Sequence, residues 1–255
     1  MHRIALLKNS IFGKKTLSYQ KYTKITLEDI TGEELQKQIL HLSKENQQAI
    51  VKARMKVIEF FEVRDNSKWS LDKDKNGAQL YSSINKKTGL KLIYRKIKIK
   101  ASLEDSIQVF KDSDMLTKLN ENIKESKKVE DLGINTAYYH NVLKGNMVVS
   151  DRDLSLLRHC FTLPDGRYAV VTYSVDHKKI PVTKKRVRAL MPLSVYLLTP
   201  IGGLYTLCES VQDGDPKGNL PAVLVNSRAG KQLESLIMIK DFIEKRKPKG
   251  FINKL

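Results

Sequence analysis

The sequence predicts an α+β fold in which helices near both ends of the chain pack on one antiparallel sheet. Two observations carry this prediction. Apolar residues recur every three or four positions before residue 62 and again after residue 232, whereas segments between residues 78 and 213 alternate between polar and apolar residues. With 255 residues, 41% of them hydrophobic, the chain can enclose a large core.

The first predicted helix starts at Thr31-Gly32-Glu33-Glu34, which has the spacing of a capping box. An apolar stripe at helical spacing follows and predicts one long amphipathic helix to about Glu62. This stripe contains Leu35, Ile39, Leu42, Asn46, Ala49, Ala53, Val57 and Phe60. Either the rest of the domain or another subunit must cover it.

The middle of the chain is predicted to form strands joined by turns and short helices. Ser102 caps a short helix that ends near Lys111, and one or two further helical turns are predicted at 114–122. Pro164-Asp165-Gly166 has the chemistry of a hairpin turn. The predicted strands are 78–83, 92–99, a strand near Lys128, 135–143, 153–163, 167–175, 187–198 and 204–213.

The last element predicted is a helical region opened by Pro221. Its apolar face contains Leu233, Leu236, Ile237 and Ile243. The order of elements therefore favours one sheet between an N-terminal helical extension and a C-terminal helix.

Arg158 stands out because it interrupts an apolar strand. Leu154, Leu156 and Cys160 share its face of the strand, and the opposite face is also largely apolar. An unpaired buried charge costs several kcal/mol. Arg158 must therefore lie at an open edge, pair with an acid, or face a cavity that holds a polar or anionic guest.

The composition limits the classes of partner. Lys and Arg total 46 against 28 acids, a net charge of +18, which favours nucleic acid or anionic lipid headgroups and also suits a protein kept soluble by lysine. Cys160 and Cys208 are too few for a disulfide framework or a zinc knuckle, which favours a reducing intracellular compartment. No apolar run is long enough to span a membrane, because Lys or Arg interrupts every candidate segment.

The first 27 residues carry six Lys or Arg and no acid, with Ile4, Leu7 and Ile11 at helical spacing. This pattern resembles an organelle-targeting segment, and we expect mitochondrial import, with a cytoplasmic protein bearing a plain basic tail as the alternative.

Several short motifs occur in a characteristic order and at characteristic distances from one another. They are Trp69, Asp151-Arg152-Asp153, Gly166, Ser174-Val175, Val187-Arg188-Ala189, Thr199-Pro200, Asp215-Pro216-Lys217-Gly218-Asn219-Leu220-Pro221 and Leu224-Val225-Asn226. Together they resemble the steroidogenic acute regulatory protein-related lipid transfer (START) domain family. The resemblance extends from about Trp69 to Lys245.

The resemblance implies a helix-grip fold, in which a curved antiparallel sheet wraps around a long C-terminal helix and leaves a tunnel for one lipid. We therefore expect a basic N-terminal segment and helix at 1–65, a START-like lipid-binding domain at 66–247 and a basic tail at 248–255. The expected function is to bind one lipid, a phospholipid being favoured, and to present or transfer it at an anionic membrane surface. No cofactor besides the bound lipid is expected.

The resemblance also assigns candidate site residues. Arg158 falls at the tunnel arginine of sterol-binding members, and Tyr139 falls where its carboxylate partner would be. Lys118 and Asn122 fall at the phosphate-contacting arginine and its companion aspartate of phosphatidylcholine-binding members. Leu156 and Arg188 complete the predicted lipid-binding set. Tyr139 lacks the carboxylate, Lys118 lacks the bidentate guanidinium, and Asn122 lacks the negative charge of the family residues at these places. These differences disfavour a sterol and a choline headgroup, and favour an anionic or ethanolamine phospholipid.

The segment 178–186 falls where the family has a mobile loop at the tunnel mouth. Its five cations suit an anionic leaflet, and its apolar residues could enter the headgroup layer; a solvated hairpin tip is the alternative. The predicted docking residues are Lys178, Lys179, Ile180, Val182, Lys184, Lys185 and Arg186.

We do not expect an enzyme or a nucleic-acid-binding protein. The five histidines lack metal-ligand spacing, no phosphate loop or nucleophile elbow is present, and the basic stretches lack interleaved aromatics. His159 is expected in the core. The alternative function is that of a non-enzymatic structural or accessory subunit, docked through the helix at 31–62 onto a larger complex such as a mitochondrial membrane complex.

Overall fold

A computed structural model describes residues 25–145, 149–226, 230 and 232–246. The predictions for residues 1–24 and for 247–255, including the targeting segment and the basic tail, lie outside these ranges. The helices are α1 (Leu27–Thr31), α2 (Glu33–Ile39), α3 (Lys44–Asn66), α4 (Leu103–Lys111), α5 (Ser113–Lys118), α6 (Ala222–Asn226) and α7 (Gln232–Lys245). The strands are β1 (Ser70–Lys75), β2 (Ala78–Ile84), β3 (Lys91–Ile99), β4 (Ile123–Gly133), β5 (Thr136–Leu143), β6 (Arg152–Thr162), β7 (Tyr168–Ser174), β8 (Val187–Arg188), β9 (Leu190–Ile201) and β10 (Tyr205–Asp215).

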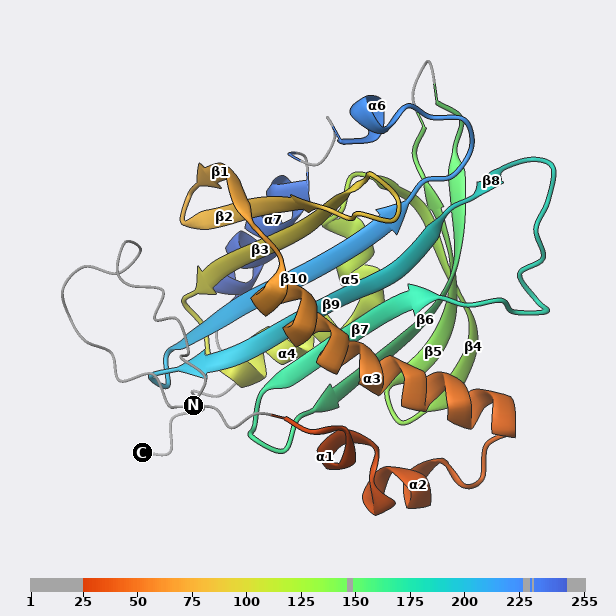
Figure 1. Cartoon of the computed structure of the whole chain (residues 1–255). Helices are drawn as coiled ribbons and strands as arrows, with labels where there is room; N and C mark the ends of the chain where they lie inside the picture. Colours follow the sequence, from red (N-terminus) through yellow and green to blue (C-terminus); the bar gives the residue numbers. More distant parts are fainter. Residues whose placement is uncertain (1–24, 146–148, 227–229, 231, 247–255) are drawn as a thin grey trace.

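The strands form one antiparallel sheet in the order β1-β2-β3-β10-β9-β7-β6-β5-β4, and the short β8 pairs in parallel with β6. Helix α3 crosses one face of the sheet, the outer face, whereas α4, α5 and α7 lie on the other, the inner face (Figure 1). This is the predicted α+β helix-grip architecture.

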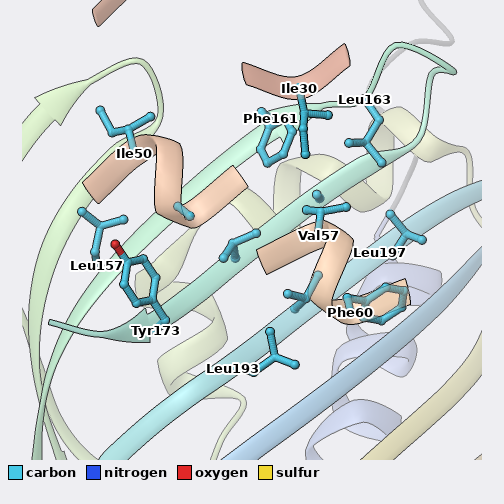
Figure 2. Close-up of a cluster of buried hydrophobic side chains, with 14 of the residues drawn as sticks. Ile30, Ile50, Val57, Phe60, Leu157, Phe161, Leu163, Tyr173, Leu193 and Leu197 are labelled. Carbon is cyan, nitrogen blue, oxygen red and sulfur yellow. The ribbon is translucent and has the colours of Figure 1, made fainter. Parts of the chain in front are cut away.

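Helix α3 belongs to the outer-face core. Its buried stripe, Ile50, Ala53, Val57 and Phe60, packs against side chains of β6, β7 and β9 (Figure 2). Of the two ways in which this apolar stripe could be covered, by the rest of the domain or by another subunit, the structure shows the first for most of the stripe.

The predicted single helix at 31–62 is wrong in two respects. Thr31 ends α1, and the capping box lies upstream, where Thr26 Oγ1 accepts from the Asp29 amide and Asp29 accepts from the Thr26 amide. The helix is also interrupted at 40–43, after which Ser43 caps α3. The break lets α1 and α2 fold back beside α3, which buries Ile30, Leu35 and Ile39 in the same core.

The inner face carries a second core between the sheet, α4 and α7. Strand β3 places Ile93, Arg95, Ile97 and Ile99 on this face, as the alternation predicted for the strand at 92–99. The predicted Ser102 cap and the hairpin turn at 164–166 are also confirmed. Strand β1 was not predicted, because its sequence, SLDKDK, is polar on both faces.

Candidate ligand-binding cavity

A cavity of about 1320 Å³ lies between the inner face of the sheet and helices α5 and α7. Strands β3, β5, β6, β9 and β10 all contribute to its wall. The sheet and the helices each bury apolar residues where they meet, but they do not fill the space between them. Apolar wall residues include Leu154, Leu156, Ala189, Met191, Ile237 and Ile239.

Two connections contribute residues to the cavity wall, β5–β6 around Gly145 and Val149, and β10–α7 around Pro216 and Leu220, and we call the part of the cavity between them the mouth. Arg152 joins them. Its guanidinium donates to the Ser150 carbonyl and hydroxyl on one side and to the carbonyls of Pro216 (3.3 Å) and Lys217 (3.4 Å) on the other. The sequence motif at 215–221 thus positions a wall of the mouth.

Exposed apolar residues lie at this mouth. Pro221, Ala222, Val223 and Leu224 are all exposed, and Leu220 and Leu224 also line the cavity. Helix α6 and the β5–β6 connection lie at the same end of the sheet (Figure 1). Leu224 therefore belongs both to the exposed apolar residues and to the cavity wall.

Arg158 lines the cavity, which is the third of the positions that the sequence analysis considered for this side chain. Its guanidinium donates to the Phe110 carbonyl and to the Lys111 carbonyl (3.1 Å), the last residues of α4. A cation at a helix C-terminus complements the helix dipole. Arg158 therefore fixes the end of α4, and much of its hydrogen-bonding capacity is used by the protein itself.

Arg95 on β3 also lines the cavity, and sequence reasoning missed it. Only 2% of it is exposed. The guanidinium donates to Ser210 Oγ (3.0 Å), the Gln232 carbonyl (2.9 Å), Tyr196 Oη (3.1 Å) and Gln212 Oε1 (3.4 Å). The alternation that singled out Arg158 would have found it, since Arg95 lies between Ile93 and Ile97 on the apolar face.

Only some of the other predicted lipid-binding residues lie at the cavity. Tyr139, Asn122 and Leu156 line the cavity, and the Tyr139 hydroxyl accepts from Ser113 Oγ (2.9 Å). Lys118 is exposed on α5 and does not line the cavity.

Arg188 does not line the cavity either. Its guanidinium pairs with the buried Asp153 carboxylate at 2.8 Å. Burial alone would raise the pKa of the Asp153 carboxyl, but the hydrogen bonds from Arg188 and His140 outweigh it, and the pKa is lowered. Asp153 stays ionised, so Arg188 already has a carboxylate partner within the chain.

The predicted docking segment 178–186 contributes no residue to the cavity wall. Lys179 pairs with Glu130 at 2.7 Å, and Arg186 lies 3.6 Å from Glu125, both acids of β4. Val182 is 69% exposed, but Ile180 is only 4% exposed. The expectation that the Ile180 side chain faces a headgroup layer is therefore wrong in this conformation, because that side chain packs into the protein.

His159 lies in the outer-face core, as expected. Arg54 Nε donates to its Nε2 (3.2 Å), so Nδ1 carries the hydrogen and donates to Thr136 Oγ1 (2.7 Å). Burial, followed by the charge of Arg54, lowers the pKa of His159 to about 3. Within the described residues no cluster of three or more His, Cys, Asp or Glu could hold a metal ion, and none of the helices there is long and apolar enough to cross a membrane.

Comparison with known proteins agrees with this architecture. The human and mouse START domain-containing protein 10 are both 30% identical to this chain over 124 residues, which is 48% of this chain and 42% of theirs. The matched region therefore spans less than half the length of these curated relatives.

Two solved structures share the fold. Human STARD10 aligns with a TM-score of 0.64 and 22% identity over 72% of this chain and 77% of its own. Human StAR-related lipid transfer protein 5 aligns with a TM-score of 0.68 and 17% identity over 78% of this chain and 96% of its own. The sequence profile of the START domain matches residues 62–238, most of the chain. The chain belongs to the START domain family.

Proposed function

We propose that this protein binds a single lipid, a phospholipid being favoured, in the inner-face cavity and presents or transfers it at a membrane surface. The cavity carries this proposal. Its volume exceeds that of most small-molecule pockets, and leucine, isoleucine and methionine side chains line much of it. Each acyl methylene buried there contributes about 0.8 kcal/mol. Carriage of an intact molecule requires no catalytic group.

Leu156, Tyr139 and Asn122 remain part of the proposed site, since all three line the cavity. Leu154 and Leu156 contact the acyl chains, while the Tyr139 hydroxyl and the Asn122 amide offer hydrogen bonds to ester or headgroup oxygens. Arg158 contributes to this wall mainly by holding α4 in place. Lys118 and Arg188 are not in the proposed binding set, because neither lines the cavity.

The lipid enters through the mouth bounded by the two connections that Arg152 joins. Exposed Pro221–Leu224 supplies apolar contact with the membrane. Lys178, Lys184 and Lys185, exposed on the neighbouring loop and without an ion pair among the described residues, supply attraction to an anionic leaflet. This moves the proposed apolar docking contact from Ile180 to the segment beside the mouth.

The test is native mass spectrometry of the full-length protein after incubation with phospholipid vesicles, followed by identification of the bound lipid. The wild type is expected to carry one lipid per chain. Ala189→Phe places a ring in the cavity wall and is expected to reduce occupancy, whereas Leu204→Phe, at a site 73% exposed and outside the cavity, leaves it unchanged. A wild-type protein that takes up no lipid from any vesicle would refute the proposal.

A further inference from the structure

Three arginines, Arg95, Arg152 and Arg158, line the cavity. None of them forms an ion pair with a carboxylate within the described part of the chain. That part contains every Asp and Glu of the sequence, from Glu28 to Glu244. The protein's own side chains therefore do not neutralise these charges directly.

Two of these arginines have a structural role that accounts for their position. Arg152 joins the two connections at the mouth through four contacts, three of them with backbone carbonyls. Arg158 binds the carbonyls at the C-terminus of α4, where the helix dipole provides negative potential.

In the described part of the chain, Arg95 has neither a carboxylate nor a helix C-terminus beside it, and its favourable electrostatic contact is with the Tyr196 ring, 5.4 Å from its Cζ. All four of its acceptors are neutral, and they occupy four of its five N–H groups. One acceptor is the carbonyl of Gln232, the first residue of α7, and the N-terminal end of a helix carries positive potential. The guanidinium is therefore almost fully buried, and the positive potential of the α7 N-terminus makes its burial less favourable.

A second polar atom on the same wall lacks a partner. Gln232 Oε1 is buried and makes no hydrogen bond with any described residue, and Gln232 lines the cavity beside Arg95. The wall thus offers one N–H of Arg95 with no acceptor among the described residues, a positive charge without a counter-ion, and an unpaired amide oxygen. Each of these is satisfied by a polar group of a ligand and not by acyl chains.

We infer that Arg95 anchors the anionic group of the bound lipid, and that the cavity selects lipids of net negative charge. This inference rests on the proposed function. A phosphate or a carboxylate accepts from the guanidinium and neutralises it. Three acids line the cavity: Glu234 pairs with Lys73 and Lys75, Asp215 pairs with Lys217, and Glu121 is exposed on the α5–β4 connection. Within the described residues, the buried part of the wall therefore has no unpaired carboxylate to receive the cation of a zwitterionic lipid such as phosphatidylcholine.

The experiment measures which lipid the full-length protein takes from vesicles of phosphatidylcholine and phosphatidylglycerol in equal amounts, by native mass spectrometry. A parallel arm replaces phosphatidylglycerol with oleate, so that uptake distinguishes a headgroup phosphate from a fatty-acid carboxylate. The wild type is expected to load the anionic lipid preferentially in at least one arm.

Two variants remove the anion site in different ways. Arg95→Gln removes the charge, and Gln212→Glu keeps Arg95 but places a carboxylate where Gln212 Oε1 now lies, 3.4 Å from the guanidinium. Each is expected to lower the ratio of anionic to zwitterionic lipid at least about tenfold. Gln212→Glu supplies an internal counter-ion, so it is expected to fold even where Arg95→Gln does not.

The control is Arg167→Gln, which removes another buried arginine, paired with Asp165 outside the cavity, and is expected to keep the wild-type ratio. Equal loading of the two lipids by the wild type in both arms, or a wild-type ratio in Gln212→Glu, would overturn the assignment of Arg95. So would loss of the preference in Arg158→Gln but not in the Arg95 and Gln212 variants. Failure of the wild type to load any lipid would instead refute the proposed function.

Discussion

Single residues in this protein have roles that depend on which face of the sheet they occupy. His159 and Arg158 are adjacent on β6, yet His159 lies in the outer-face core and Arg158 lines the cavity, because successive strand residues point to opposite faces. His159 accepts from Arg54 as a neutral imidazole. The pKa of His159 is low mainly because burial disfavours the charged imidazole, and also because the charge of Arg54 lies beside it; protonation would remove the acceptor that Arg54 uses.

The stability of the protein is therefore expected to depend on pH through His159. Its pKa is about 3 when folded and 6.5 in the reference state, so the unfolded chain binds the proton first. Stability from this residue is complete above pH 6.5 and falls by about 1.4 kcal/mol per pH unit below it, until the pH reaches the folded pKa. Urea unfolding of wild type and His159→Gln between about pH 7 and pH 5 measures this.

His159→Gln is expected to be less stable than wild type at neutral pH but to show a flatter pH dependence. His41→Gln, at an exposed position, serves as the control and keeps the wild-type slope. A slope unchanged by His159→Gln would show that other groups produce the pH dependence.

At the scale of elements, loops and helix ends are held by arginine contacts with backbone carbonyls. Arg158 binds the C-terminus of α4, and Arg152 binds the two connections that form the mouth of the cavity. Gly218 lies beside Arg152, and its φ of +76° favours glycine, because residues with a Cβ rarely adopt that backbone conformation. The 215–221 motif thus has a local geometric reason for its composition.

Arg152→Gln is expected to loosen the mouth while leaving the sheet intact. Amides of residues 149–151, 215, 217 and 218 should exchange hydrogen at least about tenfold faster, because the hydrogen bonds that join the two connections are lost. Hydrogen exchange followed by mass spectrometry checks this. Lys124→Gln, which removes the exposed pair with Asp151 nearby, should change exchange little, and a similar effect of both variants would contradict the role of Arg152.

At the scale of the whole molecule, the sheet joins two cores. Helices α1 to α3 pack on its outer face, and α4 and α7 on its inner face. Trp69, the only tryptophan, donates to the Arg64 carbonyl of α3 and lies 5.5 Å from the Tyr94 ring of β3. Its fluorescence therefore reports on contact between the helical extension and the sheet. These contacts predict that residues 25–66 unfold together with the sheet.

Phe60→Ala tests this coupling. Phe60 is fully buried between α3 and the sheet, so its truncation should lower the free energy of unfolding by about 3 to 5 kcal/mol. Tryptophan fluorescence and far-ultraviolet circular dichroism should shift to the same new urea midpoint. Met55→Ala, at a site 46% exposed on the same helix, should change stability far less. Two separated transitions would show that the helices and the sheet unfold independently.

Local chemistry in the sequence was enough to predict most elements and the fold class. The Ser102 cap, the 164–166 turn and the alternation in β3 depend on residues within a few positions of one another, and the structure contains all three. The Thr31 cap was wrong because the Thr26 motif starts a separate short helix, α1, which ends at Thr31, and Gly32 is the N-cap of α2. The upstream motif prevails in a fold where α1 and α2 turn back and bury Ile30, Leu35 and Ile39.

Only the tertiary structure decided what each cavity residue does. The sequence showed a charged residue on an apolar face at Arg158 and, by the same pattern, at Arg95. Whether such a charge meets a carboxylate, a helix end or a ligand depends on groups more than one hundred residues away, such as the Tyr196 hydroxyl and the Gln232 backbone carbonyl beside Arg95. The alternation of the local backbone determines which face of the strand a side chain occupies, so the sequence pattern can predict that face. The partners of the side chain are determined by long-range packing, which no local pattern encodes.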